Sequence, residues 1–255
     1  MINELLLTLL LSGAIALTSG LVGAFALMRR MALAADPMSH IALPGIGLAF
    51  IFQINPVIGG AATLAIGAFL IWLIEEKTKI NIEAVIGVIF AAALAIGTII
   101  TPQEELIEAL FGTLTSPSGA ELIIGLSISA AIALFILKYR HHIAINLISK
   151  ELAIASGIKT QWLNFMFLMV FAASIILGLK FLGALLMGSL IIIPAALARN
   201  ISWNFNSFLA ISAVTSFFSM ITGVLASLYF NWQLGPSVIT IASILFLITL
   251  VKRYN

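Results

Sequence analysis

Asp36 and His40 are the residues of this sequence whose types and spacing best suit chemistry within an apolar chain. They lie four residues apart, so a helix would place both side chains on one face, one turn from each other. A charge at the centre of a bilayer costs about 2.5–3.5 kcal/mol on insertion scales, and intramembrane charges usually mark a transport pathway. A carboxylate and an imidazole suit a divalent metal such as zinc, manganese or iron. Asp36 and His40 are therefore candidate metal ligands, with Met38, Ser39 and Glu83 as further candidates.

The residues around this pair favour a broken helix. Pro37 and Pro44 bracket His40, and Gly45 follows. Pro44 has no N–H, so the His40 carbonyl loses its intrahelical donor, and free carbonyls of broken helices are one means by which transporters coordinate ions. The alternative interpretation is purely structural. Asp36 would then be the N-cap of a helix with Pro37 at its first position, and His40 would be a polar residue near the headgroups.

The composition predicts an integral membrane protein. Of the 255 residues, 62% are hydrophobic and 9% are charged, whereas a soluble domain carries about a quarter charged residues. Apolar runs of about 18–25 residues indicate spanning helices rather than a barrel. The chain has no cysteine, which excludes a disulfide framework and a thiolate metal site. It also lacks the GxxxxGK[ST] phosphate loop, so we expect any ATP to be used by a partner, and a net charge of +2 gives no indication of nucleic acid binding.

The hydropathy pattern predicts an all-α polytopic bundle that forms a single transmembrane domain over residues 1–255, with short loops and about nine spanning helices (eight are also compatible). The expected segments are approximately 5–27, 35–54, 57–74, 84–100, 121–139, 162–179, 182–198, 205–230 and 236–251. The second and seventh are short or interrupted by proline, and we expect Pro194 to break the seventh. Basic residues at the helix ends place the N-terminus outside and the C-terminus in the cytoplasm, with Lys180 as the exception. Because Asp36 and His40 follow the basic Arg29, they would lie near the cytoplasmic side of the membrane, unless a broken helix carries them deeper into the bilayer.

Residues 146–158 form an amphipathic segment that is too short and too polar to span a membrane. Gly157 fits a C-terminal helix cap. A short helix at the cytoplasmic face is well placed to dock a partner, and an interfacial connector is the alternative interpretation.

The stretch ADPMSHIALPGIGLAF resembles the GDALSHAVLPGVALAF-type signature of the membrane permease subunits of ABC importers for zinc, manganese and related metals. Asp36, Ser39, His40, Pro44 and Gly45 all match this signature. The resemblance continues in AVIGVIF (84–90), LFGTLT (110–115), ELAIASGI (151–158), LGALLMGSLIIIPAALAR (182–199) and LGPSVI (234–239). It therefore covers nearly the whole chain, in order.

The resemblance implies a homodimer of permease chains in the lipid of a bacterial inner membrane, with two ATP-binding cassette subunits and an extracytoplasmic metal-binding protein as partners. It implies that Asp36 and His40 contact a transported metal that is not permanently bound, and that the partner subunit binds ATP. It also makes residues 146–158 the coupling helix. The residues expected to contact the ATPase are Lys150, Glu151, Leu152, Ala155 and Gly157. Ser149 and Lys150 stand where the family often has an acidic residue, which leaves the individual contacts open.

Three other functions remain compatible with the residues alone. An ion-coupled secondary transporter would use Asp36 as its coupling site. An ABC permease for a siderophore or corrinoid would have a wider path without a paired acid and histidine. An intramembrane enzyme would use Asp36 and His40 in its reaction, although not as a metalloprotease of the H-E-x-x-H type, whose spacing this sequence lacks. The sequence does not choose between zinc and manganese, because an oxygen and nitrogen ligand pair suits either metal.

Overall fold

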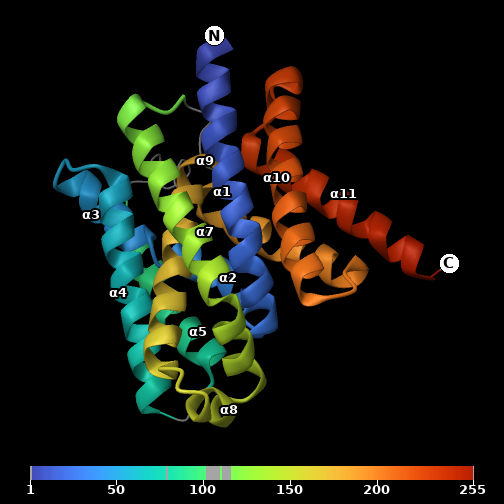
Figure 1. Cartoon of the computed structure of the whole chain (residues 1–255). Helices are drawn as coiled ribbons and strands as arrows, with labels where there is room; N and C mark the ends of the chain where they lie inside the picture. The colour runs from blue at the N-terminus through green and yellow to red at the C-terminus, as the bar shows by residue number, and fades with distance from the viewer. Residues whose placement is uncertain (1, 79, 102–109, 111–115, 255) are drawn as a thin grey trace.

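The computed structural model describes residues 2–78, 80–101, 110 and 116–254. All regular structure in these ranges is helical, in agreement with the expected all-α fold (Figure 1). The elements are α1 (Ile2–Met28), η1 (Ala32–Ala34), α2 (Ala35–His40), α3 (Leu43–Ile51), α4 (Pro56–Lys77), α5 (Ile82–Ile100), α7 (Gly119–Ile148), α8 (Lys150–Ala155), α9 (Thr160–Ile201), α10 (Phe205–Phe230) and α11 (Leu234–Tyr254). Residues 111–115 of the LFGTLT segment lie outside the described part of the chain.

Seven helices in the described ranges are long and apolar enough to cross a membrane: α1, α4, α5, α7, the first part of α9, α10 and α11. They correspond to seven of the nine expected segments. The second expected segment, residues 35–54, was expected to be short or interrupted by proline, and it is broken into α2 and α3, with turns after His40 and Ile51. Pro44 lies in the first turn of α3, where a missing N–H costs no helical hydrogen bond.

The seventh expected segment is the second half of α9, a short apolar helix over Leu186–Ile201. The break lies at Gly183, whose backbone (φ 71°, ψ 172°) is non-helical and falls in a region open essentially to glycine alone. The expected break at Pro194 is not observed, because α9 stays helical through that residue. Membrane helices tolerate an internal proline where neighbouring helices compensate for the lost hydrogen bond.

The long helices α1 and α4 both run from the upper to the lower end of the bundle in the view of Figure 1, and polar contacts join helix ends. At one end, Arg29 after α1 pairs with Glu75 of α4. At the opposite end, Lys180 of α9 lies 2.8 Å from Glu121 Oε1 in the first turn of α7. Lys180 was the exception to the pattern of basic helix ends, and this ion pair explains it. Glu121 also completes a capping box with Ser118.

The centre of the bundle is formed by α1, which packs against both α9 and α10. Phe25 of α1 and Phe167 and Phe171 of α9 are among its largest fully buried side chains. The short α2 packs against α9 and α5, and α3 packs against α4 and α5. The broken segment is therefore enclosed by long helices, and Figure 1 shows α2 within the bundle rather than at its end.

Candidate functional site

The helix α2 carries both candidate metal ligands. Asp36 is its second residue and His40 its last. The N-cap of α2 is Ala34, which makes no side-chain capping bond, so Asp36 is not the N-cap that the structural alternative required. Asp36 is half-buried and His40 is 7% exposed, and the two lie close enough to interact electrostatically. The pair therefore occupies one face of a short helix, as the spacing predicted.

Contacts from the second half of α9 hold α2 in place. The Ser39 hydroxyl lies against the carbonyl oxygens of Asp36, at 2.6 Å, and of Ala184. Gly188, one turn further along α9, touches the α2 backbone directly, because a Cβ built there would lie 2.6 Å from the Asp36 Cα. Ala184 and Gly188 thus form a seam within the chain. A Cβ on Gly87 of α5 would meet nothing within 4 Å, so that small residue faces open space.

The chain turns sharply after His40. The N–H of Ile41 donates to the Met38 carbonyl at 3.1 Å, and the N–H of Ala42 donates to the Ser39 carbonyl at 3.3 Å. These tight turns end α2. Pro44 occupies the position whose N–H would pair with the His40 carbonyl in a continuous helix, and proline has no N–H to donate. The break thus removes the helical hydrogen bond next to the imidazole.

The imidazole of His40 has an unusual environment. Its Nδ1 atom is buried and has no hydrogen-bond partner among the described residues. Its ring centroid lies 5.5 Å from that of Phe90, which is near the middle of α5. Buried polar atoms are normally hydrogen-bonded, so this nitrogen is an exception among the described residues. The contact with Phe90 also places His40 about halfway along the spanning helices, as expected for a broken helix that dips deeper.

The other candidate ligands are distributed unequally. Met38 and Ser39 are fully buried beside the pair, Met38 in the apolar core. Glu83 is exposed in the first turn of α5, and it forms no hydrogen bond or ion pair with Asp36 or His40 in the described part of the chain. The described residues contain no group of three or more histidine, aspartate or glutamate side chains that could hold a metal. Within the described residues, Asp36 and His40 thus form a candidate pair without a third carboxylate or imidazole beside them.

The predicted coupling segment is helical in two parts. Asn146 and its two successors belong to the end of α7, and α8 follows after Ser149, whose hydroxyl accepts a bond from the Leu152 N–H at 3.1 Å. Gly157 has a φ of 77°, and it and Ile158 donate back to the last turn of α8, which is the predicted glycine cap.

Apolar side chains of α8 point away from the protein. Leu152 is 54% exposed and Ile154 is 57% exposed. Glu151 lies beside them, and its pKa is lowered because its own backbone N–H and the Ser149 hydroxyl donate hydrogen bonds to the carboxylate. An exposed helix with apolar residues beside charged ones has the character of a docking surface.

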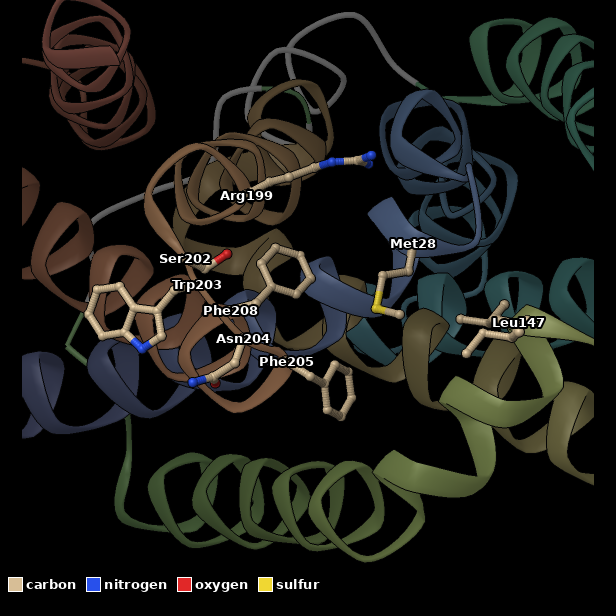
Figure 2. Close-up of a pocket in the computed structure, with 9 residues that line it drawn as sticks. Met28, Leu147, Arg199, Ser202, Trp203, Asn204, Phe205 and Phe208 are labelled. Atoms are coloured by element: carbon tan, nitrogen blue, oxygen red, sulfur yellow. The ribbon is translucent and has the colours of Figure 1, made fainter.

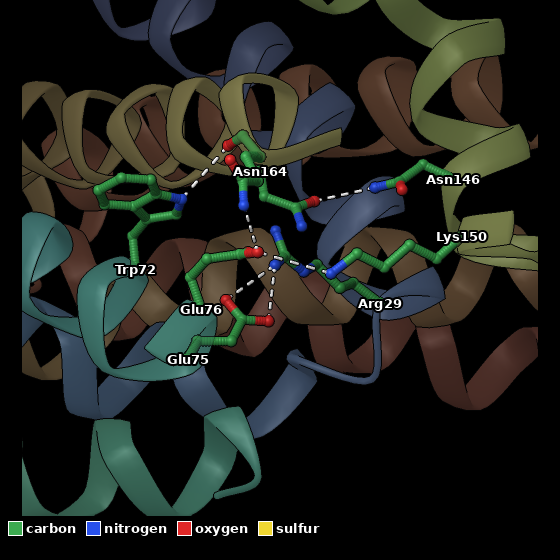
Figure 3. A network of polar contacts seen from close by, with 8 residues as sticks. Arg29, Trp72, Glu75, Glu76, Asn146, Lys150 and Asn164 are labelled. Atoms are coloured by element: carbon green, nitrogen blue, oxygen red, sulfur yellow. Dashed lines mark hydrogen bonds and ion pairs between the residues drawn. The ribbon is translucent and has the colours of Figure 1, made fainter. Parts of the chain in front are cut away.

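Two acids at the end of α4 were not identified from the sequence, which placed them in a loop. Glu75 accepts hydrogen bonds from Arg29 at 3.0 and 3.1 Å. Glu76 accepts one from Gln161 at 2.9 Å and lies 3.7 Å from the Lys150 ammonium (Figure 3). The signal that could have identified them was the pair of adjacent acids itself, because the other helix ends on this side of the bundle carry mainly basic residues.

A cavity of about 470 Å³ lies at the same end of the bundle (Figure 2). It is bordered by the ends of α1 and α7 and by the turn between α9 and α10. Its lining residues are Met28, Leu147, Ile148, Arg199, Ser202, Trp203, Asn204, Phe205 and Phe208. None of them belongs to α2, so this cavity does not contain the candidate ligands.

Known proteins resemble this chain along its whole length. It is 32% identical over 258 residues to the high-affinity zinc uptake system membrane protein ZnuB of Haemophilus influenzae, with 98% of each chain covered. It is 27% identical to the manganese transport system membrane protein MntC of Halalkalibacterium halodurans, covering 89% of this chain and 80% of that protein.

Solved structures share the fold. PsaBC from Streptococcus pneumoniae in complex with a Fab matches with a TM-score of 0.84 and 25% identity, covering 96% of this chain and 90% of that one. An inward-facing putative metal-chelate type ABC transporter matches with a TM-score of 0.72 at 17% identity and supports the fold alone, covering 96% of this chain and 84% of that one. The family model described as "ABC 3 transport family" matches residues 1–253. The chain therefore belongs to the ABC 3 transport family.

Proposed function

We propose that this chain is the membrane permease subunit of an ATP-driven importer for zinc or manganese ions. The observation that carries the proposal is the placement of Asp36 and His40 on one face of a broken helix, halfway along the spanning helices. A carboxylate and an imidazole at this depth are expensive to bury without a role. Relatives at up to 32% identity are named as zinc and manganese transport proteins, which supports this cargo.

The ligand pair of one chain is completed by a second copy in this proposal. Zinc takes four ligands in most protein sites, and each chain supplies one carboxylate and one imidazole. Two chains related by a twofold axis would supply two of each. The open face of α5 around Gly87 and Ala91 supports such an arrangement, because small exposed residues allow close helix packing beside Phe90 and His40.

The exposed surface of α8 is the docking site for the ATP-binding cassette subunit, which hydrolyses ATP, so the permease itself is not an enzyme. An extracytoplasmic protein delivers the metal to the opposite end of the bundle. The excess of Arg and Lys at the α8 end supports a cytoplasmic location for that end. ATP binding and hydrolysis then open the path alternately to the two sides of the membrane, and the metal passes Asp36 and His40 during this change.

Replacing the ligands tests the proposal. We expect Asp36→Ala and His40→Ala to abolish metal accumulation, measured by elemental analysis of cells that depend on this transporter, because each variant removes a metal contact. The permease should still co-purify with its ATPase subunit, since neither residue lies in α8. His142→Ala is the matched control, because this histidine is exposed on α7 and should be dispensable. Normal accumulation in both ligand variants would contradict the site, and uptake of a chelate without uptake of the free ion would contradict the cargo.

A further inference from the structure

The last turn of α4 presents two adjacent carboxylates to two different parts of the protein (Figure 3). Glu75 binds Arg29 through both oxygens, and the side chains are 26% and 10% exposed respectively. Glu76 instead contacts Lys150 and Gln161. Since successive helical residues point about 100° apart, neighbouring acids can hold separate partners on either side of one helix.

The partners of these acids belong to the moving parts expected of the transporter. Arg29 lies in the turn between α1 and η1, just ahead of the helix that carries Asp36. Its guanidinium also lies 5.5 Å from the ring centroid of Phe167 on α9, which restricts it further. Lys150 is the first residue of α8, and Gln161 is in the first turn of α9. The end of α4 thus joins the docking helix to the turn that leads into α2.

The middle of α4 contacts the same broken segment directly. A Cβ on Gly67 would lie 2.5 Å from Ile41 Cγ2, and Ile41 is the residue that follows His40. Gly59 of α4 and Gly45 of α3 are in mutual backbone contact, which any side chain at either position would prevent. A displacement of α4 along its axis would therefore carry the segment after His40 with it, because a packed helix moves as a rigid unit.

The strengths of the contacts distinguish two roles. The Lys150 ammonium is 3.7 Å from Glu76 and its side chain is 52% exposed, and ion pairs of this kind contribute little to stability. The contact therefore positions α8 more than it stabilises the fold. The largely buried pair of Arg29 and Glu75, in which Nη2 donates to both carboxylate oxygens, is the stronger of the two and fixes the α1 turn to α4.

We infer that Glu76 is a positioning residue that transmits movement of α8 to α4, and that α4 carries this movement to the segment containing His40. Glu75 and Arg29 form the second attachment of the same helix. This inference rests on the proposed function, because it assigns α8 to the ATPase contact. It adds a specific prediction, namely that Glu76 governs the coupling of ATP hydrolysis to metal movement while touching neither metal nor ATPase.

The test uses the complete transporter, reconstituted in proteoliposomes with its ATPase subunits and binding protein. We expect Glu76→Gln to hydrolyse ATP at close to the wild-type rate, while the metal imported per ATP falls at least about fivefold, the lower end of ordinary coupling between sites. The amide keeps the bond from Gln161 and loses only the ionic contact with Lys150. Lys77→Gln is the matched control, since Lys77 is the exposed neighbour on α4 and forms no ion pair with another described residue.

The single variants Lys150→Glu and Glu76→Lys should each lower the metal imported per ATP. The double variant that combines them should restore much of this loss, which a general loss of stability would not do. Unchanged metal per ATP in Glu76→Gln would overturn the inference. Loss of ATPase assembly in that variant would also overturn it, because Glu76 would then belong to the docking surface. Failure of the wild-type complex to import metal would instead count against the proposed function.

Discussion

Gly188 determines how closely α9 approaches α2, the helix that carries the proposed metal ligands. A Cβ at this position would lie 2.6 Å from both the Cα and the N of Asp36, and backbone atoms on both sides cannot move aside as a flexible side chain could. The seam between Ala184, Gly188 and α2 therefore sets the position of the carboxylate.

We expect Gly188→Ala to lower the free energy of unfolding by about 1–3 kcal/mol, the usual cost of overpacking a core. It should also reduce metal uptake, because Asp36 is displaced. Thermal unfolding of the purified chain in detergent and uptake in cells measure the two effects. Gly87→Ala is the control, as its Cβ would meet open space. Equal behaviour of the two variants would contradict the packing described for α2.

At the residue scale, the sequence predicted that Asp36 and His40 share one helix face, but it did not predict their surroundings. Asp36 and His40 were recognisable because an acid and a histidine at helical spacing are rare in an apolar chain. The roles of Glu75 and Glu76 were not recognisable, because charged residues near a helix end are equally typical of a solvent-exposed loop. Their partners Arg29 and Gln161 are distant in the chain, and no local pattern specifies such contacts.

The bend in α9 depends on the one residue type that can adopt its backbone. Gly183 has φ 71° and ψ 172°, a combination that costs other residues about 1–3 kcal/mol. We expect Gly183→Ala to destabilise the protein by this amount and to shift the Leu186–Ile201 helix away from α2. Hydrogen exchange of α2 amides would report that shift as increased exchange. Gly157→Asn is the milder control, because asparagine tolerates positive φ better than alanine. An unaffected Gly183→Ala variant would show that the bend does not require glycine.

Most elements followed from the sequence, and the exceptions share a physical cause. Long apolar runs predicted five spans within about a turn of their observed bounds, whereas the first span of α9 ends at Ala184 instead of 179 and α7 extends past residue 139 to Ile148. The apolar run ends near residue 139, but the helix does not, because polar residues after a spanning segment can continue the same helix. The prolines of segment 35–54 favoured a broken helix, but average hydropathy did not show where the breaks lie, because packing against α9 contributes to them. Pro194 was predicted to break its helix but does not, because tertiary contacts can maintain a helix through a proline.

The whole bundle has two chemically different ends, and its orientation can be measured directly. The chain has no cysteine, so single cysteines can be introduced into an unreactive background. We expect Gln233→Cys, in the exposed turn before α11, to react with a membrane-impermeant maleimide in intact cells. Ser156→Cys, exposed after α8, should react only after permeabilisation. The reverse pattern would place α8 outside and remove the basis for docking an ATPase there.

The length of α7 has a consequence for α8. With 30 residues, α7 is about 45 Å long at roughly 1.5 Å per residue, against a hydrocarbon core of about 30 Å. The helix is therefore longer than the hydrocarbon core is thick, and its last turns form a stalk that connects the membrane-spanning part of α7 to α8. Each residue added to this stalk would raise α8 by about 1.5 Å and rotate it by about 100°, and only about seven residues would bring it back to within roughly 20° of its heading. The height of α8 and the direction in which it faces are thus both set by the number of residues in α7, and neither can change without the other.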